Sequence, residues 1–251
     1  MKMTLFLLVA VIIAALVAAG CAGLVRNPAQ PKLGEFTYIH AVPYTGPAYR
    51  EIPIWMDREF GEADKVEIDR AIDAWNFAMN GYVKLKVVDT KFNMEVDKIV
   101  KQVNDGGWLF MKIHSSNKMV PDHRDKEKGF WTIGFCEQIG GHHMYLVRDR
   151  LSNEDVFGVT LHEIGHLMGS GHVGQRLMYP HYSRARFQCI DYETMVKVSK
   201  FFDLEMENLN YCIDGSAAGA EPVKPDGGPV MSTCPMTEES RIFNRRVWES
   251  F

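Results

Sequence analysis

Three histidines, spaced four and then six residues apart, constrain this chain more than any other feature. His162 and His166 are four residues apart, so on an α-helix their imidazoles lie on one face, one turn apart. Glu163 follows the first histidine, and its carboxylate can lean toward the same side. Gly169 predicts the end of the helix, because glycine readily adopts the positive φ of a helix C-terminus. The chain then turns, and His172 can return toward the first two rings.

Converging imidazoles of this kind predict a zinc site with His162, His166 and His172 as ligands. Three protein ligands leave a fourth position for water, which is typical of a catalytic rather than a structural zinc site. Zinc lowers the pKa of such a water and polarises a substrate carbonyl. Glu163 is then the predicted general base, which takes the proton of the water and later delivers it to the leaving amine.

The pattern HExxHxxGxxH followed by a methionine is the metzincin signature. Met178 stands six residues after His172, and the segments HEIGHLMGSGH and MYPHYS resemble the matrixins, the matrix metalloproteinase branch of the metzincins. This resemblance implies that Met178 lies beneath the zinc-binding histidines. It also implies that Pro180 to Tyr182 form a wall of the S1′ pocket, which receives the side chain after the scissile bond. Astacin-type enzymes carry a metal-reaching tyrosine where this chain has Pro180.

The resemblance covers roughly residues 36–205 and implies an α+β zincin-like domain. Its expected parts are a twisted mixed sheet, an active-site helix and a small C-terminal subdomain after Gly169. The function it implies is that of an exported zinc-dependent endopeptidase. Two other functions stay open, a non-catalytic binding lipoprotein with a zincin fold and an amidase that acts on cell-wall peptides. The intact Glu163 disfavours the first, because retaining a metal does not need that carboxylate.

Hydrophobic periodicity predicts the elements around this segment. A helix over 62–79 is predicted to bury one apolar face, which comprises Ile68, Ala71, Ile72, Trp75 and Met79. The predicted strands cover 52–56, 82–88, 108–113, 130–135 and 144–147. A second helix is predicted to run from Ser152 or Asn153 to Met168 with a capping box that ends at Asp155. A third is predicted from its N-cap Asp191 to Phe202.

The N-terminal twenty residues combine Lys2 with an apolar run and are predicted to form a signal peptide. The run is too short to favour a membrane span. Cys21 follows Ala-Ala-Gly, which resembles a bacterial lipobox and implies lipidation of that cysteine and a membrane anchor. Simple cleavage and an uncleaved anchor are the alternatives, and all three export the protein. Residues 21–35 are interpreted as a tether.

Cysteine usage agrees with an exported chain. Beside Cys21 there are four cysteines, which predict two disulfides. The sequence leaves their pairing open, and a bond between Cys212 and Cys234 is favoured because these two bracket a loose segment. Zinc binding by Cys136, Cys189 or the other two is the alternative.

The remaining features are less specific. The formal net charge of −4 without a block of basic residues gives no indication of nucleic-acid binding. Residues 206–251 are interpreted as a C-terminal extension, with a short amphipathic helix near 243–251 that packs on the domain or meets a membrane surface. Several residues fall where matrixins hold a second metal, but solvated loop histidines are the favoured interpretation. They are His114, Asp122, His123, His142 and His143.

Overall fold

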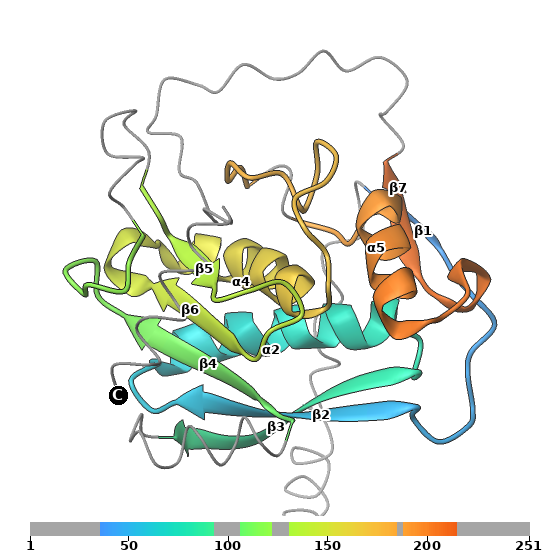
Figure 1. Ribbon diagram of the computed structural model, residues 1–251, viewed down its shortest axis with the longest axis horizontal. Helices are drawn as coiled ribbons and strands as arrows, with labels where there is room; N and C mark the ends of the chain where they lie inside the picture. Colours follow the sequence, from blue (N-terminus) through green and yellow to red (C-terminus); the bar gives the residue numbers. More distant parts are fainter. Residues whose placement is uncertain (1–35, 93–105, 122–130, 185–187, 215–251) are drawn as a thin grey trace, which may run out of the picture. The chain divides into compact units, whose positions relative to one another are not determined.

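The computed structural model describes residues 36–92, 106–121, 131–184 and 188–214 (Figure 1). The predicted signal peptide, Cys21, the tether and the helix near 243–251 lie outside these residues. So do Cys234, Asp122 and His123. None of the helices in the described ranges has the length and apolar character needed to cross a membrane.

The central element is a mixed sheet of five strands, as predicted, in the order β3-β2-β4-β6-β5 (Figure 1). The strands are β2 (Arg50–Asp57), β3 (Val83–Phe92), β4 (Trp108–Ile113), β5 (Gly134–Cys136) and β6 (His143–Val147). The pairs β2–β3, β2–β4 and β4–β6 are parallel, and only β5 runs antiparallel to its neighbour β6. Both faces of β4 and β6 are buried, which accounts for their nearly continuous apolar sequence.

Strand β5 begins later than the sequence predicted. The expected strand over 130–135 is replaced by a pairing that starts at Gly134 opposite Leu146 and ends at Cys136. Before Gly134, the contact with β6 is limited to the carbonyl oxygen of Ile133, which accepts a hydrogen bond from the backbone N–H of Val147. Thr132 and Ile133 are buried by packing rather than by strand pairing. Burial without pairing is the reason that apolar pattern alone misplaced this strand.

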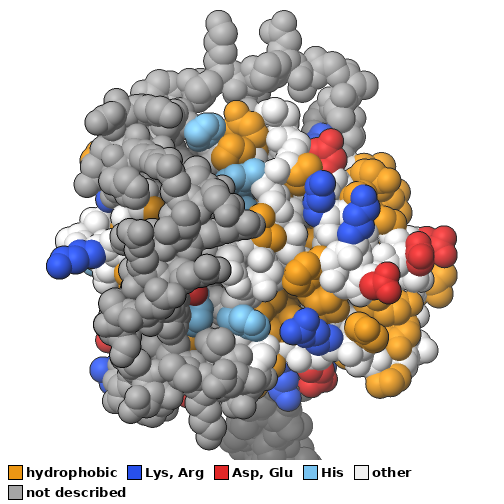
Figure 2. Space-filling view, viewed as in Figure 1, with side chains coloured by type: hydrophobic (Ala, Val, Ile, Leu, Met, Phe, Trp, Pro, Cys, Tyr) orange, Lys and Arg blue, Asp and Glu red, His pale blue; other side chains and the backbone are white. Residues whose placement is uncertain are grey.

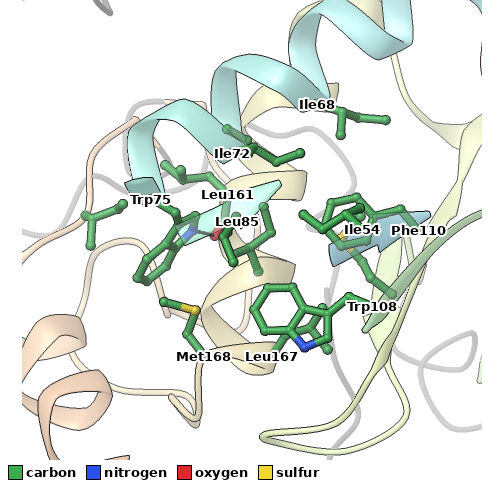
Figure 3. Packing of buried hydrophobic residues seen from close by; sticks show 14 of the residues in the cluster. Ile54, Ile68, Ile72, Trp75, Leu85, Trp108, Phe110, Leu161, Leu167 and Met168 are labelled. Carbon is green, nitrogen blue, oxygen red and sulfur yellow. Dashed lines mark hydrogen bonds between the residues drawn. The ribbon is translucent and has the colours of Figure 1, made fainter. Parts of the chain in front are cut away.

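Helices α2 (Glu62–Ala78) and α4 (Asn153–Leu167) pack on each other and on one face of the sheet (Figure 1). The predicted apolar face of α2 is buried, and Trp75 is its centre (Figure 3). The indole Nε1 of Trp75 donates a 3.0 Å hydrogen bond to the carbonyl oxygen of Leu161. This bond joins the two helices within an otherwise apolar layer. Helix α4 is buried continuously from Val156 to Leu167, so its position is fixed from all sides.

The N-terminus of α4 corrects one prediction. Ser152 is the N-cap, but its side chain makes no capping hydrogen bond to the backbone. Instead the Ser152 hydroxyl donates to Oδ2 of Asp155 at 2.5 Å. The carboxylate of Asp155 also accepts hydrogen bonds from Tyr182 and Arg184. The capping box is therefore absent because these side chains hold Asp155 away from the cap backbone.

The remaining elements are α5 (Tyr192–Phe202), capped by Asp191 as predicted, and a two-stranded sheet of β1 (Phe36–Ile39) with β7 (Tyr211–Asp214). Two short 3-10 turns, Arg148–Arg150 and Met206–Asn208, connect longer elements. Because β7 pairs with β1, the described fold continues across residue 205, where the sequence placed the start of an extension.

The disulfide prediction was wrong in its pairing. Cys212 on β7 is bonded to Cys189, which precedes α5, and not to Cys234. Cys136 is a buried thiol on β5. A loose segment between two cysteines did not predict their pairing. Strand β7 brings Cys212 next to the residues before α5, where its backbone N–H donates to the carbonyl oxygen of Ile190.

Candidate metal centre

The end of helix α4 turns the chain back toward its own histidines. Gly169 has φ of 92°, and its N–H donates to the carbonyl oxygen of His166. The N–H of Ser170 donates to the carbonyl oxygen of Gly165, which completes the Schellman pattern of a helix C-terminus. A Cβ at residue 169 would lie 2.2 Å from Cγ of Phe201, so glycine is required both by conformation and by space.

Backbone carbonyls orient the two helical histidines. Nδ1 of His162 donates to the carbonyl oxygen of Leu177 at 2.5 Å, and Nδ1 of His166 donates to that of Ser170 at 2.8 Å. With the proton on Nδ1, the lone pair of each ring is on Nε2, the atom that faces away from the carbonyl. Nε2 of His166 is buried and has no hydrogen-bond partner among the described residues. A buried nitrogen acceptor without a hydrogen-bond partner fits the role of a metal ligand.

The three predicted histidines converge. One ligand atom from each of His162, His166 and His172 lies within 4.8 Å of the others, close enough to hold a single metal ion. The ring of His172 lies 4.9 Å from that of His166 and 5.6 Å from that of His162. Figure 2 shows histidine side chains at separate places on one face of the molecule.

Burial keeps these rings neutral. It lowers the pKa of His166 to about 3 and that of His172 to about 4, with a further contribution from neighbouring imidazoles. The pKa of His162 is also lowered well below its ordinary value, first by burial and then by the other two histidines. A neutral imidazole is the form that binds a metal. The site is thus built to offer three lone pairs at neutral pH.

Met178 lies against the turn of helix that separates the first two histidines. A Cβ added to Gly165 would lie 2.5 Å from Sδ of Met178, so the methionine occupies the space that a side chain at 165 would take. The same Cβ would lie 3.4 Å from the ring of Trp75. A glycine in a helix interior costs about 0.5–1 kcal/mol relative to alanine, and this close approach accounts for it. Met178 is fully buried.

The carboxyl group of Glu163 faces strand β5. Sγ of Cys136 lies 3.4 Å from Oε2 of Glu163 and 3.2 Å from its carbonyl oxygen. A Cβ on Gly134 would meet Oε1 of Glu163 at 3.0 Å, so the bare glycine makes room for the carboxyl group. Oε1 is buried without a hydrogen-bond partner among the described residues. Burial raises the pKa of Glu163 well above its ordinary value, and the thiol of Cys136 opposes this.

The sequence does not predict that the two β5 residues belong to the site. It indicates a disulfide for Cys136 and a strand position for Gly134. Their spacing of two, which places both on one face of a strand, was the available signal. Only the packing of β5 on α4 shows that this face meets Glu163.

Residues 179–184, called the wall segment below, follow Met178 and include the predicted pocket residues Pro180 and Tyr182. Both are partly buried. The hydroxyl of Tyr182 donates to Oδ1 of Asp155 at 2.7 Å, which brings the wall segment to the first turn of helix α4. Arg184 reaches the same carboxylate. The wall segment is therefore attached to the helix that carries His162 and His166.

The described histidines that were predicted for a second metal site each make separate contacts. His114 contacts Ser116 by a 2.9 Å hydrogen bond, and Nδ1 of His142 lies 3.2 Å from the carbonyl oxygen of Gly107. His143 is not a solvated loop residue, because it lies on β6, is buried and contacts Glu137 at 2.7 Å. Among the described residues, His162, His166 and His172 form the one group of three or more side chains that could bind a metal ion together.

No protein-family model matches the chain, and no curated protein matches it. Among solved structures, metalloproteinase-II from Bacteroides fragilis is similar, with 19% identity and a TM-score of 0.40. The match covers 66% of this chain and spans 57% of the length of that one. The case for a function therefore rests on the residues of this chain.

Proposed function

We propose that the protein is a zinc-dependent endopeptidase. The observation that carries this proposal is the convergence of three neutral imidazoles on the helix and turn that also carry a buried carboxyl group, that of Glu163. A binding-only site would need the histidines but not the carboxyl group. Burying a carboxyl oxygen without a partner costs free energy, and catalysis gives a reason for keeping it.

The ligand set fits zinc. Three neutral nitrogens at this spacing suit a tetrahedral ion with one open position, and zinc is commonly bound by imidazole. The buried Nε2 of His166 supplies a ligand atom without a competing hydrogen bond. A zinc ion held there would act as a Lewis acid and lower the pKa of a water molecule toward neutrality.

Glu163 is the proposed general base. Its Oε1, which has no hydrogen-bond partner among the described residues, accepts the proton of the attacking water and later passes it to the leaving amine. Burial raises the pKa of Glu163, and a higher pKa makes its carboxylate a stronger base toward the proton of the water. Gly134 and Cys136 limit where this carboxyl group can lie.

The finer assignment is a matrixin-like metzincin. It is supported by Met178, packed against Gly165 between the first two ligands, and by the wall segment with Pro180 and Tyr182.

Export, with Cys21 as a lipid anchor at the cell surface or in the periplasm, belongs to the same proposal and rests on the N-terminal sequence alone. Cys21→Ser should then release the protein from the membrane fraction.

Protein digestion with a matched variant tests the proposal. Glu163→Gln keeps the side-chain volume and removes the charge and basicity. Because general-base catalysis contributes about 10²–10⁴-fold, cleavage of a denatured protein substrate should fall by that factor. Zinc content, measured by elemental analysis, should stay near one ion per chain, since the three histidines remain.

Two results would contradict this assignment. Cleavage by Glu163→Gln within about threefold of wild type would remove Glu163 as the base. Wild-type protein that holds zinc yet cleaves no protein would favour the binding lipoprotein, or the cell-wall amidase if purified wall peptides are hydrolysed.

A further inference from the structure

The carboxylate of Asp155 joins two residues of the wall segment to helix α4. Oδ1 of Asp155 accepts hydrogen bonds from the hydroxyl of Tyr182 at 2.7 Å and from Nε of Arg184 at 2.6 Å. Oδ2 accepts from a terminal nitrogen of Arg184 at 3.1 Å and from the Ser152 hydroxyl at 2.5 Å. Two residues of the wall segment, Tyr182 and Arg184, thus donate hydrogen bonds to one side chain.

Asp155 is well placed to act as a rigid anchor. Its side chain is only 15% exposed, whereas that of Arg184 is 54% exposed. Asp155 lies seven residues before His162 on a helix that is buried from residue 156 onward, or roughly 10 Å along the axis at 1.5 Å per residue. The helix therefore fixes the distance between the metal ligand and the point where the wall segment is held.

The negative charge of Asp155 strengthens its hydrogen bonds to Tyr182, Arg184 and Ser152. Hydrogen bonds to an ionised carboxylate are about twice as strong as neutral ones, and Arg184 approaches both oxygens of the group. Burial opposes ionisation of Asp155, but the hydrogen bonds from Arg184, Ser152 and Tyr182 outweigh it and lower its pKa to about 2. Asp155 is therefore ionised at neutral pH.

We propose that Asp155 is a specificity-determining positioning residue, which holds Tyr182 and Arg184 so that the wall segment keeps a fixed distance from helix α4. This inference rests on the proposed peptidase function, in which the wall segment borders the pocket for the residue after the scissile bond. Asp155 itself does not touch the reacting groups. Loss of its carboxylate frees the hydroxyl of Tyr182 to bond with water, and the pocket loses its defined width.

Glu154 offers a matched control. It is the adjacent acid on the same turn and contacts Arg184 at 2.7 Å, but it makes no described contact with Tyr182. Its side chain is 76% exposed. Exposed ion pairs contribute little, so Glu154→Gln removes a charge of the same sign from the same place without removing the anchor.

The test uses the full-length, zinc-loaded protein and peptides that differ only in the residue after the scissile bond, which is alanine, leucine or phenylalanine. In Asp155→Ala the ratio of kcat/KM between the best and the worst peptide should fall on the order of tenfold, the scale at which pocket fit discriminates apolar side chains. Asp155→Asn, which keeps an acceptor for Tyr182, should restore part of that ratio. Glu154→Gln should leave the ratio unchanged.

Tyr182→Phe completes a double-mutant cycle. If the two residues act through one hydrogen bond, the double variant Tyr182→Phe/Asp155→Ala should be no less selective than Asp155→Ala alone. Hydrogen exchange adds a readout independent of activity, because amides of the wall segment should lose protection in Asp155→Ala and keep it in Glu154→Gln.

The outcomes separate this inference from the function on which it rests. Wild-type protein that cleaves none of the peptides, nor any protein, overturns both. Wild-type cleavage with an unchanged selectivity ratio in a folded Asp155→Ala variant overturns the role of Asp155 alone. Equal loss of selectivity in Glu154→Gln also overturns it, because the effect would then come from charge and not from the anchor.

Discussion

The end of helix α4 and the wall segment border the same candidate site but are held by different forces. The helix end is fixed by burial and by backbone carbonyls, which bind Nδ1 of His162 and His166. The wall segment is held by hydrogen bonds and ion pairs to Asp155, partly at the surface. The first arrangement tolerates little change, while the second can be adjusted by single exposed substitutions.

The largest stability effect is expected where the helix end turns. Gly169→Ala should lower the free energy of unfolding by roughly 2–5 kcal/mol, because alanine resists positive φ and its Cβ would lie 2.2 Å from Cγ of Phe201. Gly171→Ala is the control, since its Cβ would meet only Cδ1 of Ile139 at 3.2 Å. Urea denaturation of both variants measures the difference. Equal stability of the two would show that the helix end is more adjustable than its packing indicates.

A comparable effect is expected from the disulfide that follows the wall segment. Cys189 and Cys212 are 23 residues apart, and a cross-link of that span stabilises a fold by about 3 kcal/mol. The double variant Cys189→Ser/Cys212→Ser should lose stability of that order. Hydrogen exchange should show faster opening at residues 188–191 and 211–214 than in α4. Equal loss of protection throughout α4 would mean that the disulfide stabilises helix α4 as much as it stabilises residues 188–191 and 211–214.

The smallest effect is expected from acid. The pKa of Asp155 is lowered to about 2, below its value in the unfolded chain, so its contribution to stability is fully present above about pH 4. That contribution is lost as the pH falls from about 4 toward 2, because the unfolded chain takes up the proton first. Asp155→Asn should therefore lose less stability than wild type over this interval in thermal unfolding. Parallel curves would show that Asp155 does not anchor the wall segment.

Some features followed from the sequence because they depend on local geometry. A spacing of four on a helix places His162 and His166 on one face, and a glycine three residues later predicts the turn toward His172. The apolar faces of α2 and the N-cap Asp191 of α5 were predicted for the same reason, since neighbours within a few residues decide them.

Only the tertiary structure decided contacts between residues distant in sequence. It paired Cys189 with Cys212, placed Cys136 and Gly134 of β5 against Glu163, and diverted Asp155 from a capping box to Tyr182 and Arg184. None of these contacts has a periodicity along the chain, because each depends on how separate elements pack. The sequence by itself determined the candidate set of metal-binding histidines, whereas packing determined the groups that surround and orient them.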